Sequence, residues 1–337
     1  MKHTVIIILL VIWVCAPCLE AQSQVEITLR AVEFFGLDDT TAAELYRESA
    51  LSDGNTMFLG DLRRRLQEIK KSLEADPEII FVNIDQVGIP RDFGDIKKGY
   101  YVTIDVVTEH NEAFRSLRTV PDGAVSLEGE LKGLLNKYET ACRKAEDSGI
   151  DEEDREGFYY YDDADVRLIT ARMKIVADSA FAHLSQVIME SSDETDRAAA
   201  ATLIGAATDK QAAVRVLIEA TRDPDAGVRN NAARVMIPIT AYGVSTKAYE
   251  VPVDPFLAMI QLPTATDRNK AGLVLGHRVA GEPYLGQRIR QEIGELLVRM
   301  AESKQPNNYY TGRGLIRAVS GRDYSDHPDG WRAWLIE

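Results

Sequence analysis

The fold is decided by residues 223–233, which read Asp-Pro-Asp-Ala-Gly-Val-Arg-Asn-Asn-Ala-Ala. The first three residues are typical of a turn, because proline restricts the residue before it and an aspartate can cap a helix. A helix is therefore expected from about Val228 to Ile239. The small side chains of Ala232 and Ala233 would let a neighbouring helix approach closely.

The same pattern occurs three times in the C-terminal half. Arg197, Arg229 and Arg268 each precede a run with small residues by the same offset. The first two arginines are 32 residues apart, and the second and third are 39 residues apart. We attribute the longer step to a loop inserted at residues 242–254. A repeat of this length indicates stacked helix pairs, each of which buries its apolar stripe only against its neighbours.

The polar residues of the repeat have expected structural roles. Asp193 and Asp225 share the 32-residue step, and Thr264 takes the equivalent place in the third copy. Side chains of these types cap the first turn of a helix, so we expect each to lie at a helix N-terminus. The arginines can form a ladder with the acids of adjacent turns.

The run from Asp223 to Ala233 resembles HEAT repeats, in particular the short bacterial kind. The resemblance is strongest in this copy and extends over residues 166–337. It implies an all-α solenoid whose concave face binds another protein. Further helices are expected at residues 166–178, 181–190, 211–221, 284–303 and 309–319.

The end of the chain carries two tryptophans. Trp331 and Trp334 are spaced by three, which places them on one face of a last helix. Because a terminal repeat needs its open end closed, we interpret them as a cap that seals the final repeat. A ligand-binding aromatic pair is the alternative.

Residues 24–108 predict a separate α+β domain. Apolar and polar residues alternate in Val25–Arg30, as expected of a half-buried strand. The order strand, helix, helix, strand, strand follows, which predicts a three-stranded sheet with two helices on one face. The expected helices are residues 41–50 and 59–75, and the expected later strands are residues 79–87 and 100–107.

This βααββ order resembles a POTRA (polypeptide-transport-associated) domain of bacterial envelopes. The resemblance rests on the strand 25–35 that ends at Gly36, the turn at Gly54, and the elements given above. It implies that the domain binds other polypeptides, often along a free sheet edge, where unpaired backbone groups are offered. Such domains usually precede a membrane β-barrel, and the sequence after Thr108 does not look like barrel strands. A domain that only spaces or caps the solenoid is the alternative.

Between these domains, residues 109–165 form an acidic stretch with 16 acidic and 7 basic residues. Leu127–Lys144 has helical periodicity, and acidic runs flank the aromatic residues 158–161. We interpret the stretch as an acidic helical linker whose aromatic residues pack on the next helix. An acidic-aromatic site for a basic partner or a cation is the alternative, although the spacing is not that of a calcium loop.

The first 21 residues are expected to be a secretory signal peptide. Val5–Val14 is an apolar run too short to cross a bilayer comfortably, and Ala21 follows it in a plausible cleavage context. An uncleaved anchor and a lipoprotein with Cys18 as its lipidated residue are the alternatives. The mature chain keeps one cysteine, Cys142, so no internal disulfide is expected. An exported protein of this kind would reside in the periplasm or cell envelope, with no membrane span after cleavage.

Composition and motifs exclude several classes of function. The net charge of −14 disfavours nucleic-acid binding, because phosphate contacts need clustered cations. The five histidines are isolated along the chain, so we expect no metal and no cofactor. Some HEAT-like proteins are enzymes, namely bilin lyases and metal-dependent hydroxylases. The hydroxylases need repeated His-Glu pairs, which this chain lacks, and a bilin lyase would act in the cytosol. The sequence therefore predicts a non-enzymatic protein-binding scaffold or adaptor of the bacterial envelope, with a capped HEAT-repeat binding module as the alternative.

Overall fold

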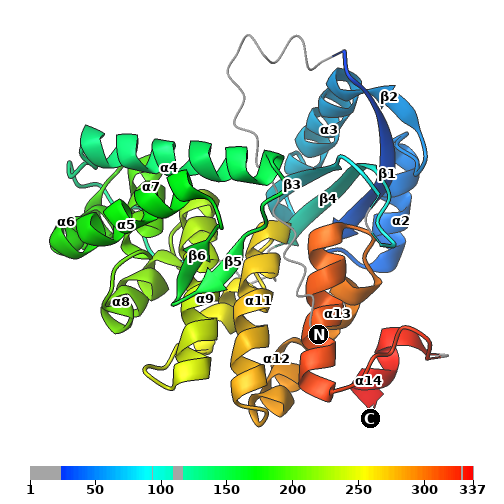
Figure 1. Cartoon of the computed structure of the whole chain (residues 1–337). Coiled ribbons are helices and arrows are strands. Elements are labelled where there is room, and N and C mark those ends of the chain that lie inside the picture. Colours follow the sequence, from blue (N-terminus) through cyan, green and yellow to red (C-terminus); the bar gives the residue numbers. More distant parts are fainter. Residues whose placement is uncertain (1–23, 93, 109–116, 328, 337) are drawn as a thin grey trace.

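A computed structural model describes residues 24–92, 94–108, 117–327 and 329–336. The expected signal peptide, residues 1–21, lies outside the described residues. The protein has an N-terminal mixed sheet with two helices, followed by a long array of helices (Figure 1). No described helix is both long enough and apolar enough to cross a membrane.

The sheet has four strands, not the expected three. They are β1 (Glu26–Phe35), β2 (Thr56–Phe58), β3 (Ile79–Ile89) and β4 (Gly99–Thr108), in the spatial order β2-β1-β4-β3. β1 pairs parallel with β4, and the other pairs are antiparallel. The additional strand is β2, which forms because the turn at Gly54 leads the chain back along β1. Gly54 N donates to Leu29 O there at 2.7 Å.

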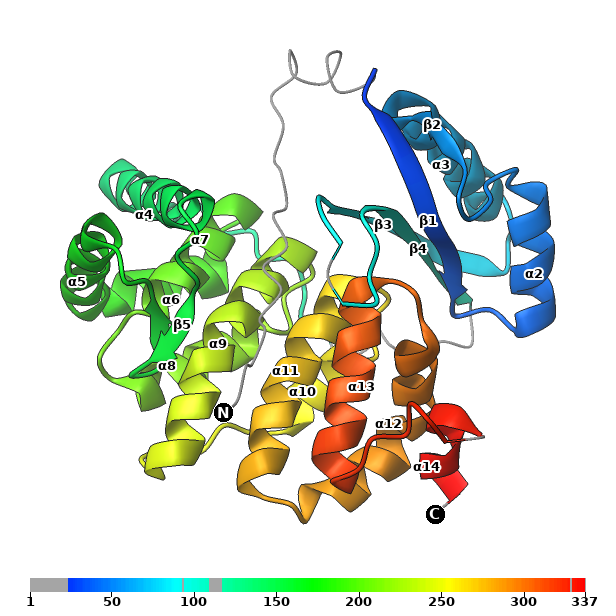
Figure 2. The same ribbon diagram turned by 45° about the vertical axis from the view of Figure 1, so that its right-hand side comes forward.

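The two faces of the sheet bury different kinds of side chain. Helices α2 (Asp39–Glu48) and α3 (Leu59–Glu74) cover one face through an apolar core that includes Leu66, Val102 and Ile104. The opposite face carries the alternate residues of the same strands, and it lies against the helical array (Figure 2). The alternation of β4 therefore separates two buried faces, one apolar and one on which Thr103 and Asp105 lie among Tyr101 and Val107.

Nine helices after the acidic stretch form the helical array. They are α5 (Ala164–Ser179), α6 (Phe181–Glu190), α7 (Glu194–Ile204), α8 (Lys210–Ala220), α9 (Ala226–Thr246), α10 (Asp254–Met259), α11 (Ala265–Gly281), α12 (Leu285–Glu302) and α13 (Pro306–Ser320). Helices α7, α9, α11 and α13 stack in that order to form one layer, here called the stacked layer. Helices α8, α10 and α12 alternate with them along the chain and pack against the same layer.

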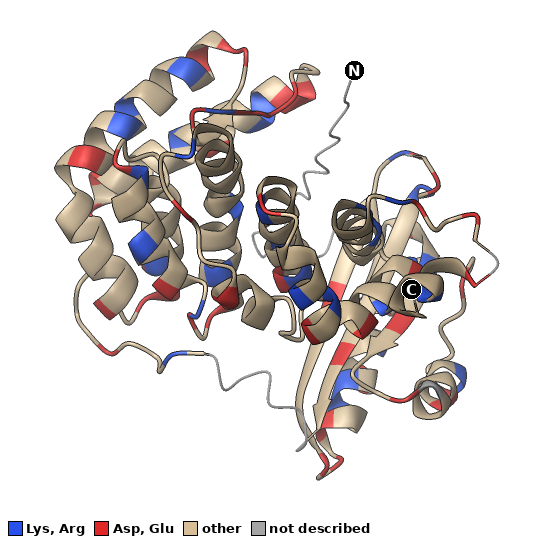
Figure 3. Ribbon diagram, turned by 90° about the horizontal axis from the view of Figure 1, so that it is seen from below, with Lys and Arg blue, Asp and Glu red and all other residues tan. Residues whose placement is uncertain are grey.

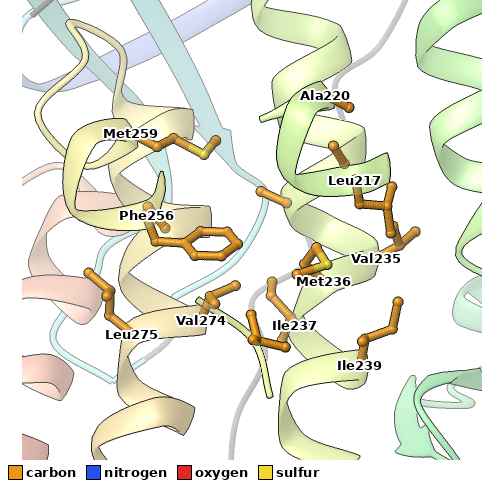
Figure 4. Packing of buried hydrophobic residues seen from close by; sticks show 14 of the residues in the cluster. Leu217, Ala220, Val235, Met236, Ile237, Ile239, Phe256, Met259, Val274 and Leu275 are labelled. Atoms are coloured by element: carbon orange, nitrogen blue, oxygen red, sulfur yellow. The ribbon is translucent and has the colours of Figure 1, made fainter. Parts of the chain in front are cut away.

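The core between the helices is apolar and fully buried. Leu217 of α8, Met236 of α9, Phe256 of α10 and Val274 of α11 lie in it with exposures of 0% (Figure 4). The expected inserted loop is shorter than residues 242–254, because α9 continues to Thr246 before Lys247 ends it in a left-handed conformation. The inserted loop still leaves one continuous core.

Residues 127–161 belong to the helical body. Helix α4 (Gly129–Asp147) buries Leu131, Leu135 and Tyr138 in the same core as the repeats. A hairpin of β5 (Glu153–Arg155) and β6 (Phe158–Tyr160) lies on α9. The structure therefore differs from the linker that we expected, since the aromatic residues pack on a repeat helix distant in sequence. The acidic composition indicated a linker, but the acidic side chains occupy only part of the stretch, and its apolar side chains lie in the helical core.

A small residue permits the close approach of α13 to α12. A Cβ atom added to Gly312 on α13 would lie 2.5 Å from the backbone nitrogen of Ala301. A Cβ atom on Gly314, two residues further along the same helix, would meet nothing within 4 Å. The two glycines therefore form a matched pair for testing the packing.

We expect Gly312→Ala to lower the free energy of unfolding by about 2 kcal/mol, because the added methyl group collides with rigid backbone. Gly314→Ala should instead raise it by roughly 0.5–1 kcal/mol through helix propensity. Urea unfolding followed by circular dichroism measures both. Equal effects of the two substitutions would contradict the packing described here.

Candidate functional site

The repeat arginines form a buried ladder across the stacked layer. Arg197 Nε and Nη2 each donate to the Asp223 carboxylate at 2.9 Å. Arg229 donates to Asp267 in the next repeat, with its shortest contact at 2.6 Å. Both arginines are almost fully buried, with 1% and 3% exposure. Each arginine therefore ties its own helix to the turn or helix that begins the following repeat.

The third rung of this ladder is different. Arg268 Nε donates to Asn308 Oδ1 of α13 at 2.9 Å, and an amide cannot balance the arginine charge. The missing carboxylate comes from Asp105 of β4, which accepts from Arg268 Nη1 at 2.6 Å and from Nη2 at 3.1 Å. The N-terminal sheet therefore supplies the acid that the last repeat lacks.

The predicted capping residues lie at helix N-termini. Asp193 accepts from Thr195 N at 2.8 Å at the start of α7, and Asp225 accepts from Val228 N at 3.0 Å at the start of α9. Thr264 accepts from Asp267 N at 2.9 Å at the start of α11. These bonds satisfy backbone donors that have no partner within the helix. Asp267 is thereby held in place to accept from Arg229.

Asp105 is one of three carboxylates on the sheet face that meets the helices, and we call Glu33, Asp85 and Asp105 the acidic face. Glu33 of β1 accepts from Lys304 N at 2.6 Å, just before α13 begins. Asp85 of β3 accepts from Ala265 N, the first residue of α11, at 2.7 Å. Figure 3 shows acidic segments on the strands beside the helices. A helix N-terminus carries partial positive charge, so each of these contacts is electrostatically favourable.

Burial raises the pKa of two members of the acidic face, Asp85 and Asp105. Burial and, second, the neighbouring Asp105 charge raise the pKa of Asp85 to about 6. Burial also raises the pKa of Asp105, although the adjacent Arg268 opposes that shift. The charges of Asp85 and Asp105 are therefore supported by their helical partners, the backbone N–H of Ala265 and the Arg268 guanidinium.

Additional contacts surround the acidic face. Lys304 Nζ lies 2.6 Å from Asp53 Oδ2, and Tyr309 donates to Asp95 Oδ2 at 2.7 Å. Phe35 at the end of β1 packs in the helical core, with the Arg268 guanidinium 4.5 Å from its ring centroid. We call this whole set of contacts, together with the acidic face, the interdomain latch.

A pocket of about 910 Å³ opens beside the latch, between the end of β1 and α12. Its lining includes Arg290 and Arg299 but also Glu292 and Glu295, so opposite charges are mixed. No group of three or more His, Cys, Asp or Glu side chains in the described parts of the chain could hold a metal ion.

Two surfaces of the described structure are candidates for binding a partner, besides the short edge strand β2. Within the described residues, β3 pairs only with β4, so its other edge is unpaired. Ile80 and Phe81 near its start are 55% and 36% exposed. The second surface is the side of the stacked layer that carries the β5–β6 hairpin.

The two tryptophans lie at the end of the helical array. Trp331 belongs to a short 3-10 helix (Gly330–Arg332) and Trp334 to α14 (Ala333–Ile336). The two tryptophans therefore lie on two successive short helices, not on the single last helix that we expected. Both are buried, with exposures of 4% and 2%. The Arg313 guanidinium of α13 lies 5.2 Å from the Trp331 ring centroid. The pair thus packs against the last two long helices.

Sequence patterns alone did not identify Asp85 and Asp105. Both occupy polar positions of alternating strands, which usually face solvent. One signal for Asp105 was available in the arginine ladder. Arg268 meets Asn308 where the preceding arginine, Arg229, meets an aspartate, so an acid from elsewhere in the chain was needed.

We predict that Arg268→Met lowers the free energy of unfolding by about 3–5 kcal/mol, because it leaves the Asp105 charge buried without a counter-ion. Adding Asp105→Asn should recover at least half of that loss by removing the orphaned charge. A double-mutant cycle in urea measures the coupling. Losses that simply add in the double variant would contradict the buried pair.

The pH dependence of Asp85 provides a second test. Its folded pKa of about 6 lies above the ordinary value of 3.8, so the penalty for its charge is fully present above pH 6 and is relieved as the pH falls towards 4. Asp85→Asn keeps an acceptor for Ala265 N without the charge. The free energy of unfolding of the variant should exceed that of the native protein by up to about 3 kcal/mol at pH 7.5, with the gap closing near pH 4. A gap that is independent of pH in urea titrations would refute this assignment.

One segment of the chain matches a known protein family. Residues 181–275 match a family model described as HEAT repeats. No curated protein matches the chain. The matched segment runs from α6 into α11 and includes all three ladder arginines. The protein therefore contains a HEAT-repeat region, built on a helical array that continues beyond the match to α13.

Proposed function

We propose that the protein is a non-enzymatic scaffold that binds other proteins, and that it does so as an adaptor exported to the bacterial periplasm or cell envelope. The HEAT-repeat region supports the binding role, because such repeats present long helical surfaces to partners. The interdomain latch is the observation that carries the adaptor role. It fixes the free β3 edge and the stacked layer in one geometry, so that one partner can be presented to another.

The POTRA resemblance contributes a specific binding mode to this proposal. An extended segment of a partner would add to the β3 edge by main-chain hydrogen bonds. The exposed Ile80 and Phe81 side chains would give the added strand apolar contacts. The signal peptide expected from the sequence supports export, and the envelope location follows from it.

A second candidate is a capped HEAT-repeat binding module. Asp105 completes the third rung of the arginine ladder, which is what a terminal cap does. In this case the sheet would stabilise the last repeats, and only the stacked layer would bind partners. The two candidates differ in whether the β3 edge is used.

Proline substitutions at alternate positions of β3 distinguish these candidates. One set begins at Ile80 and the other at Phe81, and one of the two removes only N–H groups that point away from β4. In the adaptor, the set that preserves folding should abolish cross-links between residues 25–108 and the partner identified by in-cell cross-linking. Undiminished cross-links with a folded variant, checked by circular dichroism, would leave the capped module.

A further inference from the structure

Helix α5, the first of the helical array, is apolar on two opposite sides. Val166, Met173 and Ala177 are buried in the helical core. Leu168 and Ile175 lie on the other side of the helix and are 74% and 61% exposed. A helix that is apolar on both sides is typical of one packed between two neighbours. In the described structure, only one of these two sides of α5 is covered.

The two exposed side chains form one continuous surface, and we call Leu168, Ala171, Arg172 and Ile175 the α5 face. Seven residues are close to two turns of an α-helix, so Leu168 and Ile175 point within about 20° of each other, roughly 10 Å apart along the axis. Ala171 between them is also exposed. In the described part of the array, no other helix exposes two large apolar side chains. Anchors at i and i+7 are the pattern of a helix that packs on a second helix.

The place of α5 in the array explains why this face is open. The helix begins the array and lies at the end remote from the sheet (Figure 2). At the opposite end, Trp331 and Trp334 are buried, and Trp331 packs against α13. An end of a repeat array that exposes apolar side chains can continue the stack with a helix from another molecule.

A guanidinium group without a partner lies within the α5 face. Arg172 is four residues after Leu168 and three before Ile175, so it is a neighbour of both on the helix surface. Among the described residues, Arg172 has no hydrogen-bond, ion-pair or aromatic partner. The other four charged side chains of α5 each have a partner, namely Asp165 with Lys144, Arg167 with Asp162, Lys174 with Glu156, and Asp178 with Thr208. Within the described structure, the charge left unpaired on α5 is therefore positive and lies inside the apolar face.

We propose that the α5 face binds an amphipathic helix of a partner protein, with large apolar side chains over Leu168 and Ile175 and a carboxylate over Arg172. Covering the two apolar side chains removes them from water, and the acid pairs with the guanidinium at the rim of the contact. The proposal rests on the scaffold function. It specifies the chemistry of one partner and a surface separate from the β3 edge and the stacked layer.

A second copy of this chain fits the α5 face less well. In an antiparallel pair of α5 helices, Leu168 of one copy would meet Ile175 of the other, as a two-fold axis requires. The Arg172 side chains of both copies would then lie close to that axis, where like charges repel. A helix with an acid at this place has no such repulsion, so charge complementarity favours a different protein.

The test uses the full mature chain and a fluorescent, acetylated and amidated peptide, followed by polarisation at low ionic strength. The peptide is alanine-rich and about 18 residues long, so that it forms a helix, with leucines at i, i+4 and i+7 and a glutamate at i+3. Leu168→Ser and Ile175→Ser should each weaken binding by about tenfold or more, because an apolar contact is lost. Tyr284→Ser removes a side chain of the same 74% exposure just before α12 and should change binding less than about twofold. All variants are first shown to melt like the native protein.

An exchange of charges tests the role of Arg172. A second peptide carries lysine in place of the glutamate and should bind the native protein about threefold more weakly, as expected of one exposed ion pair. Arg172→Glu should reverse this preference between the two peptides. Equal affinity of the native protein for both peptides would overturn the proposal. So would equal effects of the serine substitutions on α5 and at Tyr284, or no binding of the glutamate peptide up to about 1 mM.

Sedimentation of the native protein and of Ile175→Ser distinguishes a partner from a second copy. Both should sediment as monomers. A native dimer that Ile175→Ser dissociates would show that a second copy covers the α5 face, and it would contradict the assignment. If these arms fail while the partner identified by in-cell cross-linking persists, the scaffold function stands and only this site is wrong.

Discussion

The buried pair of Arg268 and Asp105 is the contact on which the arrangement of the two halves depends. It joins a repeat helix to a strand that precedes it by more than 150 residues, with both side chains almost fully buried. A charge at such a site requires an opposite charge, because its solvation by water is lost. Glu33 and Asp85 add contacts with the N-terminal ends of α13 and α11. Three carboxylates on one sheet face thus make the orientation of the sheet specific, where an apolar face could slide.

This constraint also explains how the arginine ladder ends. Each internal arginine pairs with an acid that the next repeat supplies, and the last one meets Asn308 instead. A solenoid must close its terminal repeat with something other than another repeat. Here the sheet closes the ladder on one side, and the buried tryptophans pack against the final helices at the other. The same domain therefore stabilises the array and is held by it.

The sequence predicted those elements whose signals are local or repeated. The helix from Leu59, the strands around Val82 and Ile104, and the HEAT pattern around Arg229 all follow from periodicity or repetition. The resemblance to POTRA domains stays a prediction, since only the mixed sheet and its two helices are established. Strand β2 was not predicted, because a strand of three residues is too short to show an alternation of apolar and polar residues. The aromatic residues 158–161 were expected to pack on the next helix, whereas Tyr159 packs on α9, a distant part of the chain, which local sequence does not reveal.

The acidic face could not be predicted for a related reason. A polar residue at alternate strand positions has the same appearance in the sequence whether water or a helix N-terminus lies above it. Only the assembled fold distinguishes Asp105 from a solvated aspartate. The acidic face is thus a consequence of how the sheet meets the helices.

The most direct test of the fixed arrangement is a distance distribution between spin labels on the two halves. Labels at Lys71→Cys on α3 and Arg215→Cys on α8, in a Cys142→Ala background, occupy exposed positions on separate bodies. Double electron–electron resonance should give one narrow distribution, because the latch holds the sheet against the helices. A broad distribution, as for two domains on a flexible connection, would contradict the account.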